Sequence, residues 1–128
     1  MTLYLHGLGH FHPENQITNR FLEELDIGTD EKWILDRVGI RSRRTVLSLD
    51  YIRDTRNRDP SQAMEAALST HAETGGLATE VALERAGITR DAIGMVIAGS
   101  SRPGLSSPAD ACQIAAALGM EVPAFDMN

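Results

Sequence analysis

The segment from Thr29 to Gly39 carries the side chains best suited to binding chemistry. Trp33 and Arg37 are four residues apart, so on a helix they lie on one face, one turn from each other. An indole beside a guanidinium can hold a flat base while the cation meets a phosphate. The alternative is structural, with Trp33 in the core and Arg37 an exposed helix cation, and spacing alone favours this alternative.

The single cysteine is a second candidate for chemistry. Cys112 falls in the first turns of an expected helix, where the thiolate form is favoured. A nucleophile also needs a base partner and access to solvent. Because its neighbours Ala111 and Ala115 are small, we expect Cys112 to be buried as a small apolar residue.

Other catalytic motifs give weaker signals. Ser100 and Ser101 follow an expected strand, but the G-x-S-x-G pattern, a phosphate loop and a dinucleotide fingerprint are all missing from the sequence. His6, His10 and His12 share strand parity, which would suit a metal if the first strand ran that far. Pro13 and the missing fourth ligand argue against it, so we expect no metal.

Composition narrows the class of protein. The chain has 128 residues, is 42% hydrophobic and has a formal net charge of -6, which argues against general nucleic-acid binding. Its apolar runs fall well short of the about 18 residues of a membrane span, and its start lacks the basic region of a secretory signal. One cysteine excludes an internal disulfide. We therefore expect a soluble, cytoplasmic protein with no nucleic-acid or membrane partner.

The positive charges are concentrated in one stretch. Seven of the twelve basic residues lie in one quarter of the sequence, a distribution that suits a small anionic partner, although such a run is more often a solvated face. These residues are Arg37, Arg41, Arg43, Arg44, Arg53, Arg56 and Arg58.

The elements that would position these residues are one strand and several helices in the first two thirds of the chain. We expect a strand over 2–10, in which Gly7 and Gly9 permit close backbone approach, and then a loop over 13–19. Glycines 75 and 76 are expected to break or kink a helix that Pro60 begins. The other expected elements are a helix from Thr18 or Asn19 through Leu25, a helix that Thr29 caps and Gly39 closes, and a helix over 77–86.

The last third is the most informative stretch. Residues 93–98 indicate a buried strand, and Ser107, Pro108 and Asp110 together predict a capped helix start. Gly119 would end that helix, and a second apolar run over 122–125 leads to Asp126. Strand edges and apolar faces at this point need cover, so we expect further polypeptide beyond the chain.

These segments resemble the 3-oxoacyl-acyl-carrier-protein synthase III family of thiolase-like condensing enzymes. The resemblance is strongest over 27–44 and 87–126. It implies a layered α/β fold with a mixed sheet flanked by helices. Residues 1–128 would form the amino-terminal half of a condensing-enzyme domain, and the complete protein would be a homodimer. The matching residues are Thr29, Trp33, Arg37, Gly39, Ile40, Arg41 and Arg44, then 107–114, 118–119 and 123–126.

The resemblance also implies roles for individual residues. Thr29, Trp33 and Arg37 would lie against the adenine end of coenzyme A, with acyl-CoA a substrate rather than a tightly bound cofactor. Ser107 stands where some members carry a bulky aromatic that closes the partner's acyl pocket, so medium or long acyl chains are expected to fit. The nucleophilic cysteine would come about three residues beyond Asn128, and this chain alone would be inactive.

The implied reaction is a decarboxylative Claisen condensation of an acyl-CoA primer with malonyl-acyl carrier protein or malonyl-CoA. Two alternatives remain from sequence. A relative on the same scaffold would join two acyl chains or transfer an acyl group to an alcohol, and a noncatalytic chain would serve as an interaction subunit. The segment at about 45–76 departs from compact family members, and either alters the acyl pocket or dimer contact or is a surface elaboration.

Overall fold

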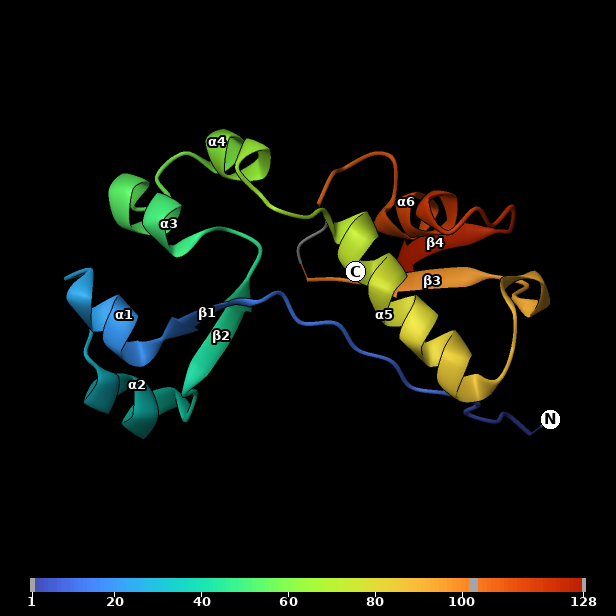
Figure 1. The fold of residues 1–128 in the computed structure, drawn as a ribbon, viewed down its shortest axis with the longest axis horizontal. Helices are drawn as coiled ribbons and strands as arrows, with labels where there is room; N and C mark the ends of the chain where they lie inside the picture. The colour runs from blue at the N-terminus through green and yellow to red at the C-terminus, as the bar shows by residue number, and fades with distance from the viewer. Residues whose placement is uncertain (1, 102–103, 128) are drawn as a thin grey trace. The chain divides into compact units, whose positions relative to one another are not determined.

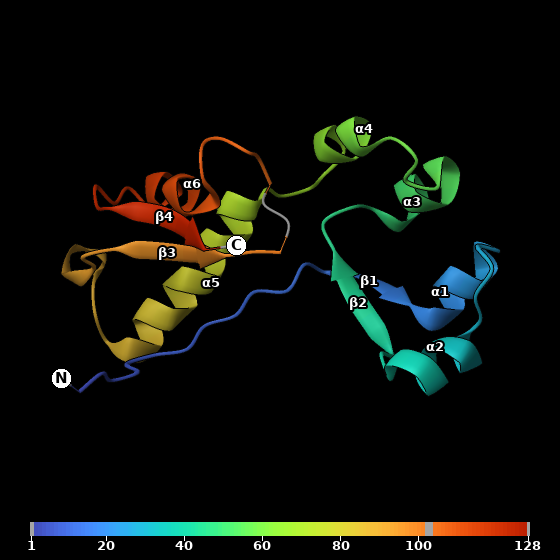
Figure 2. The same cartoon turned by 180° about the vertical axis from the view of Figure 1, so that it is seen from behind.

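The computed structural model describes residues 2–101 and 104–127, which fold into two compact units (Figures 1 and 2). One unit contains His12–Leu68. The other contains Met1–Phe11 together with Ser69–Asn128. Each unit has its own pair of strands and its own apolar cluster.

The unit His12–Leu68 is built on an antiparallel strand pair, in which Ile17 lies opposite Arg43. Its core is formed by Phe21, Leu25 and Ile52. The expectation of a loop over 13–19 is wrong, because residues 15–18 find a hydrogen-bonding partner in the arginine-rich segment. The elements are β1 (Asn15–Thr18), α1 (Asn19–Glu24), α2 (Glu31–Val38), β2 (Ser42–Thr45), α3 (Leu49–Thr55) and α4 (Pro60–Glu65).

Local capping rules account for most helix starts in this unit. The Thr18 hydroxyl accepts a 3.1 Å hydrogen bond from the backbone N–H of Phe21, as predicted, and Asp59 caps the helix that Pro60 begins. The prediction that Thr29 caps α2 is wrong by one residue. The carboxylate of Asp30 accepts the bond from Trp33 N at 2.7 Å. Gly39 closes this helix with a φ of 72°, as expected.

The other unit pairs two parallel strands and packs α6 against both of them and against α5 (Figure 1). Ala115, Leu118 and Met120 form its buried cluster. Its elements are α5 (His71–Ala86), a 3₁₀ turn η1 (Arg90–Ala92), β3 (Val96–Gly99), α6 (Asp110–Ala117) and β4 (Ala124–Met127).

The first segment of the chain is not the strand that its alternation predicts. Residues 2–10 carry no strand pairing and run beside α5, where the Arg85 guanidinium donates to the carbonyl of Leu8 at 2.9 Å. A Cβ on Gly7 would lie 2.4 Å from the Ala82 carbonyl oxygen, and Gly9 is similarly close to the α5 backbone. The expected close backbone approach is therefore present, with a helix rather than a strand as partner.

Gly75 and Gly76 lie inside an unbroken α5, so the predicted break there is wrong. A Cβ on Gly75 would stand 2.6 Å from Cδ1 of Ile114 on α6. The two glycines cost helix propensity but allow two helices to pack closely. The chain instead breaks between α4 and Thr70, which caps α5 in a reciprocal capping box with Glu73.

The start of α6 also differs from its sequence signal. The helix begins at Asp110, so its N-cap residue is Ala109, whose side chain makes no capping hydrogen bond. The predicted cap, Ser107, lies two residues too early. The carboxylate of Asp126 at the end of β4 accepts from Asp110 N at 2.9 Å and from Ala111 N at 2.8 Å. A cap from a distant strand leaves no trace in the local pattern. Gly119, with a φ of 66°, follows the helix as predicted.

The two parallel strands are half-covered rather than buried. β3 begins at Val96, three residues later than expected, and its residues alternate between partly buried and exposed. Ile97 lies opposite Phe125, and both side chains are exposed together with Met127. The expected burial therefore holds for one face only, because α6 covers that face and the other is open among the described residues.

Candidate functional site

The exposed face of α2 carries the pair that the spacing singled out. Trp33 is 53% exposed, and Arg37 is exposed one helical turn further on. A core role for Trp33 is therefore wrong, whereas the exposure of Arg37 agrees with the structural alternative. A large aromatic side chain left in solvent beside a cation forms a surface that can stack a flat ring and attract an anion.

The opposite side of α2 explains this orientation. Ile34 is buried, and helices α1 and α2 pack against each other. Burial of Ile34 turns its predecessor Trp33 outward, since adjacent helix positions point about 100° apart. On the exposed surface Lys32 and Asp36 form an ion pair at 2.5 Å.

Thr29 precedes the same helix but presents its hydroxyl differently. Its Oγ1 atom is buried and finds no hydrogen-bond partner among the described residues. A buried hydroxyl without a partner is uncommon and costs free energy. The polar atom of Thr29 is therefore turned into the protein, in contrast to the exposed side chains of Trp33 and Arg37.

The arginine-rich stretch divides into structural and unengaged members. Arg43 donates to Oδ1 of the buried Asn19 at 2.7 Å, and Arg44 donates to the carbonyl of Glu14 at 2.8 Å. Arg53 pairs with Asp50 and lies 5.4 Å from the Phe21 ring centroid, and Arg56 donates to the carbonyl of Leu25. Over 2–101 and 104–127, the guanidinium groups of Arg37, Arg41 and Arg58 make no hydrogen bond or ion pair.

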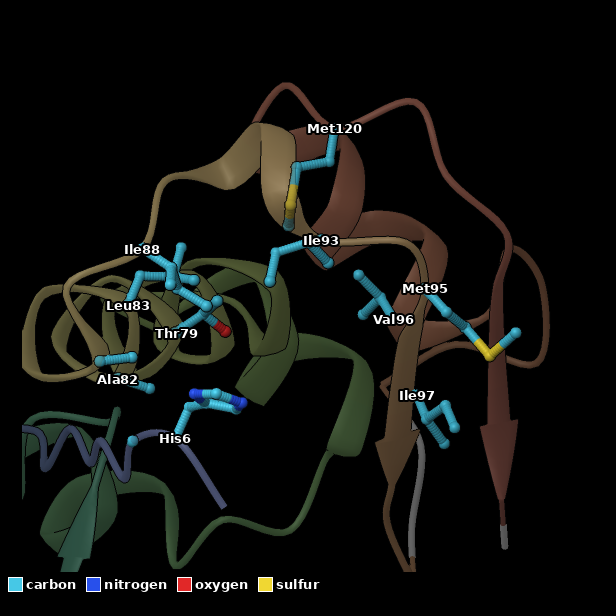
Figure 3. Close-up of a pocket in the computed structure, with 12 residues that line it drawn as sticks. His6, Thr79, Ala82, Leu83, Ile88, Ile93, Met95, Val96, Ile97 and Met120 are labelled. Carbon is cyan, nitrogen blue, oxygen red and sulfur yellow. The ribbon is translucent and has the colours of Figure 1, made fainter. Parts of the chain in front are cut away.

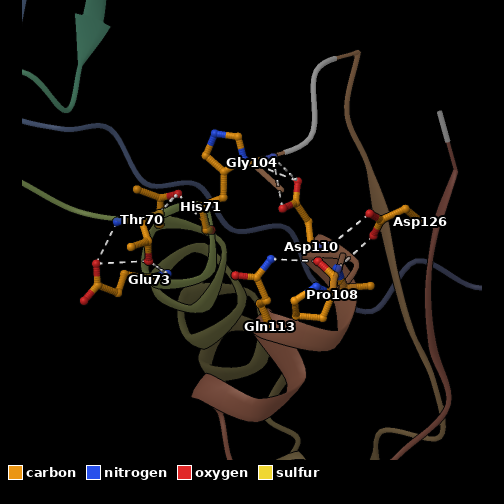
Figure 4. Close-up of polar contacts among 10 residues, drawn as sticks. Thr70, His71, Glu73, Gly104, Pro108, Asp110, Gln113 and Asp126 are labelled. Carbon is orange, nitrogen blue, oxygen red and sulfur yellow. Dashed lines mark hydrogen bonds and ion pairs between the residues drawn. The ribbon is translucent and has the colours of Figure 1, made fainter. Parts of the chain in front are cut away.

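The other unit presents the loop that carries Ser107. Ser107 is exposed and lies just ahead of α6. Within the same loop the backbone N–H of Gly104 donates to Oδ1 of Asp110 at 3.2 Å. The Nδ1 atom of His71 lies 3.3 Å from the other carboxylate oxygen of Asp110 (Figure 4). Gly104 of this loop and His71 of α5 therefore converge on one buried carboxylate.

Cys112 is exposed, so the prediction that it is buried is wrong. Ala111 and Ala115 are the α6 residues that face the core, and Cys112 lies at the margin of that face. Its thiol approaches the carbonyl oxygen of Ala124 at 3.4 Å. No described side chain with basic character contacts the thiol, so the structure supplies it with no activating partner.

A hollow of about 320 Å³ lies between the first segment, α5 and β3 (Figure 3). Its lining is mainly apolar, with Leu83, Ile93, Val96 and Met120 among the wall residues. The Thr79 hydroxyl donates to the Gly75 carbonyl at 2.8 Å, so its proton is already engaged and only its lone pairs could meet a ligand. Such a lining suits an apolar group but contains no arrangement for catalysis.

The described part of the chain contains neither a metal-binding cluster nor a membrane-spanning helix. No group of three His, Cys, Asp or Glu side chains there is arranged to hold a metal ion. Within the same residues, no helix has the length and apolar character to cross a membrane.

The sequence did not reveal the buried polar cluster. The sequence pattern predicts that Asp110 takes part in capping its own helix, and it gives no sign that His71 is a partner of Asp110. In the structure His71 opens α5, Asp110 opens α6, and Asp126 caps α6 from β4. Only the presence of an acidic residue in an otherwise apolar run could have hinted at a partner for Asp126.

Comparison with known proteins gives a consistent picture. No family model matches the chain. It is 34% identical over 122 residues to β-ketoacyl-acyl-carrier-protein synthase III of Citrobacter koseri and, equally, to that of Salmonella arizonae. The match covers 94% of this chain and 32% of each relative, so the chain spans about a third of their length. The resemblance predicted from the sequence is confirmed.

Solved structures agree in fold. The 3-oxoacyl-acyl-carrier-protein synthase III of Aquifex aeolicus aligns with a TM-score of 0.72 at 28% identity, over 94% of this chain and 33% of that one. The priming β-ketosynthase of the R1128 polyketide pathway gives 0.72 at 27%, over 96% and 31%. A tetronic acid condensing enzyme gives 0.74 at 24%, over 96% and 34%, a likeness of fold alone. The α/β, thiolase-like fold class is thereby confirmed over part of those structures.

Proposed function

We propose that this chain is part of a β-ketoacyl-acyl-carrier-protein synthase III, an acyltransferase of fatty-acid or polyketide synthesis. The observation that carries the proposal is the 34% identity that extends over 94% of the chain. The reaction proposed for the complete protein is the decarboxylative condensation of an acyl-CoA primer with a malonyl thioester, held on acyl carrier protein or on CoA. We further propose that the protein acts in the cytoplasm.

In the proposed reaction a cysteine thiolate attacks the primer thioester and expels the CoA thiolate. Loss of CO₂ from the malonyl group then leaves a carbanion that attacks the acyl-enzyme carbonyl and returns the cysteine thiolate. By the resemblance, a histidine and an asparagine assist the decarboxylation, and they and the cysteine would lie in the remaining carboxy-terminal polypeptide, so this chain alone would be inactive. Its own contribution is a surface for CoA, part of the acyl pocket and a dimer contact.

The α2 surface is the proposed site for the adenine end of CoA. The exposed Trp33 indole offers a flat apolar face, and Arg37, one turn away, has no partner within the described residues. Stacking of the base on Trp33 would bring a phosphate within reach of an arginine that no structural bond restrains. Thr29 is included in this proposal because of the resemblance alone. Its hydroxyl faces the protein interior, so the geometry gives it no direct contact with CoA.

The open face of the β3 and β4 pair supports the proposal of a longer protein. Ile97, Phe125 and Met127 are exposed side by side on this face. Contiguous apolar surface of this kind marks a place where another element packs. We propose that the remaining polypeptide covers it.

Ser107 is the proposed determinant of primer size. Its small, exposed side chain would leave room that a bulky aromatic at the same place would fill. In the full-length protein the substitution Ser107→Phe is therefore expected to shift preference from medium-chain toward short-chain acyl-CoA. Unchanged chain preference would remove Ser107 from the acyl pocket.

The proposed reaction is tested by following labelled acyl-CoA in the full-length protein with and without a malonyl donor. The proposal predicts a chain extended by two carbons and release of CO₂, only when the malonyl donor is present. A product made without that donor would instead indicate a relative that joins two acyl chains or acylates an alcohol. Absence of any product from a folded, CoA-binding protein would favour the noncatalytic interaction subunit.

A further inference from the structure

The carboxylate of Asp110 forms a buried polar cluster outside the surfaces described above. Only 5% of its side chain is exposed. The backbone N–H of Gly104 donates to both oxygens, at 3.2 Å to Oδ1 and 3.3 Å to Oδ2, and Oδ2 also lies 3.3 Å from Nδ1 of His71 (Figure 4). The two donors come from segments 33 residues apart in the chain, because His71 opens α5 and Gly104 follows β3.

The chemistry of the groups fixes the direction of these bonds. An ionised carboxylate only accepts hydrogen bonds, so with such a carboxylate the contact is a hydrogen bond when Nδ1 of His71 carries the proton. A buried carboxylate without such donors would be costly, which gives both contacts a role in holding the segment in place. His71 keeps 55% of its side chain exposed, so its ring serves as the outer wall of the cluster.

The same cluster restrains the loop that carries Ser107. Asp110 holds Gly104 ahead of Ser107, and the Gln113 side-chain amide donates to the Pro108 carbonyl at 3.0 Å just after it. Asp110 is itself held through its backbone N–H by Asp126. Ser107 therefore sits between two tethers, and each tether is anchored on α6.

We propose that His71 and Asp110 are positioning residues that set the acyl-chain selectivity of the enzyme by fixing the Ser107 loop. This inference rests on the proposed function and on the place of Ser107 in the acyl pocket. Neither side chain is assigned contact with the substrate. Their effect passes through the position of the backbone from Gly104 to Pro108.

The direct test compares two substitutions at one position in the full-length protein. His71→Leu keeps the bulk but removes the donor, whereas His71→Asn keeps an N–H donor where Nδ1 stands. For His71→Leu we expect faster hydrogen exchange of the Gly104 amide. We also expect the ratio of kcat/KM for octanoyl-CoA to kcat/KM for acetyl-CoA to move about tenfold toward unity, which is the effect of a small change in an apolar pocket. His71→Asn should restore both readouts toward wild type.

A second variant reaches the cluster without removing any donor. A Cβ on Gly104 would lie 3.0 Å from His71 Nδ1 and 3.3 Å from Asp110 Oδ1, so Gly104→Ala should push the contacts apart and reproduce the effect of His71→Leu. Faster exchange at unchanged selectivity in both variants would overturn the positioning role. Unchanged exchange would overturn the tether itself.

Failure of the positioning role can be distinguished from failure of the proposed function. If Ser107→Phe alters chain preference while His71→Leu and Gly104→Ala do not, the inference fails and the acyl-pocket proposal stands. If the full-length protein does not condense acyl-CoA with a malonyl thioester at all, the proposed function fails. The exchange rates at Gly104 would then still report whether the tether exists.

Discussion

The two units present their candidate residues in opposite ways. In His12–Leu68 the candidates Trp33 and Arg37 stand exposed on a helix whose start and end follow local rules. In the other unit the key polar contacts are partly buried and join residues far apart, such as Asp126 to the start of α6. The difference teaches that spacing can place two candidate side chains on one helix face, whereas a tethered loop is visible only after folding.

The largest expected effect concerns the distant cap. Asp126→Ala removes both acceptors from the first turn of α6 and should lower the free energy of unfolding by about 2–3 kcal/mol, as for a charged partner lost from buried donors. Chemical denaturation of the full-length protein measures this. Ser107→Ala is the matched control, because the sequence pattern predicts Ser107 as the cap but the structure shows no capping hydrogen bond from it. A greater loss for Ser107→Ala than for Asp126→Ala would reverse the assignment.

Close packing of α5 on α6 gives the next effect. Gly75→Ala places a methyl group 2.6 Å from Cδ1 of Ile114 and should destabilise by about 1–2 kcal/mol, although alanine gains about 1 kcal/mol in helix propensity. The control is Gly94→Ala, where an added Cβ meets nothing within 4 Å. Stabilisation by Gly75→Ala, measured by thermal unfolding, would show that the glycine serves no packing role.

A smaller effect separates the two residues at the start of α2. Asp30→Ala removes the cap on Trp33 N and should cost about 1 kcal/mol. Thr29→Val replaces a buried hydroxyl that has no partner among the described residues with a methyl group of similar size, so stability should hold or rise. Loss of stability in Thr29→Val, by denaturant titration, would show that the hydroxyl has a partner after all.

The helix caps and stops that depend on neighbours in sequence could be predicted, as Thr18, Gly39 and Gly119 show. Features set by distant contacts could not. Residues 2–10 have a strand pattern but pack along a helix, and Gly75 looks like a helix breaker but marks where Ile114 approaches. Alternation and propensity state what a segment can form, and the partner it meets decides what it does form.

The candidate site follows the same division. The spacing of Trp33 and Arg37 located an exposed pair, but could not tell whether the tryptophan was core or surface. The arginine-rich stretch suggested a single positive patch, whereas Arg43 and Arg44 are engaged in holding the unit together. A count of charges cannot separate cations that bind a ligand from cations that bind their own backbone.

The most direct test of the account is the affinity of the full-length protein for CoA after substitution on α2. Trp33→Ala and Arg37→Ala should each raise the Kd by about tenfold or more, as loss of one base stack or one phosphate contact does. Lys32→Ala removes a cation from the same helix, where its contact is an exposed ion pair with Asp36, and should leave the Kd unchanged. Equal affinity of all three variants for CoA, measured by calorimetry, would contradict the assignment of this surface to the coenzyme.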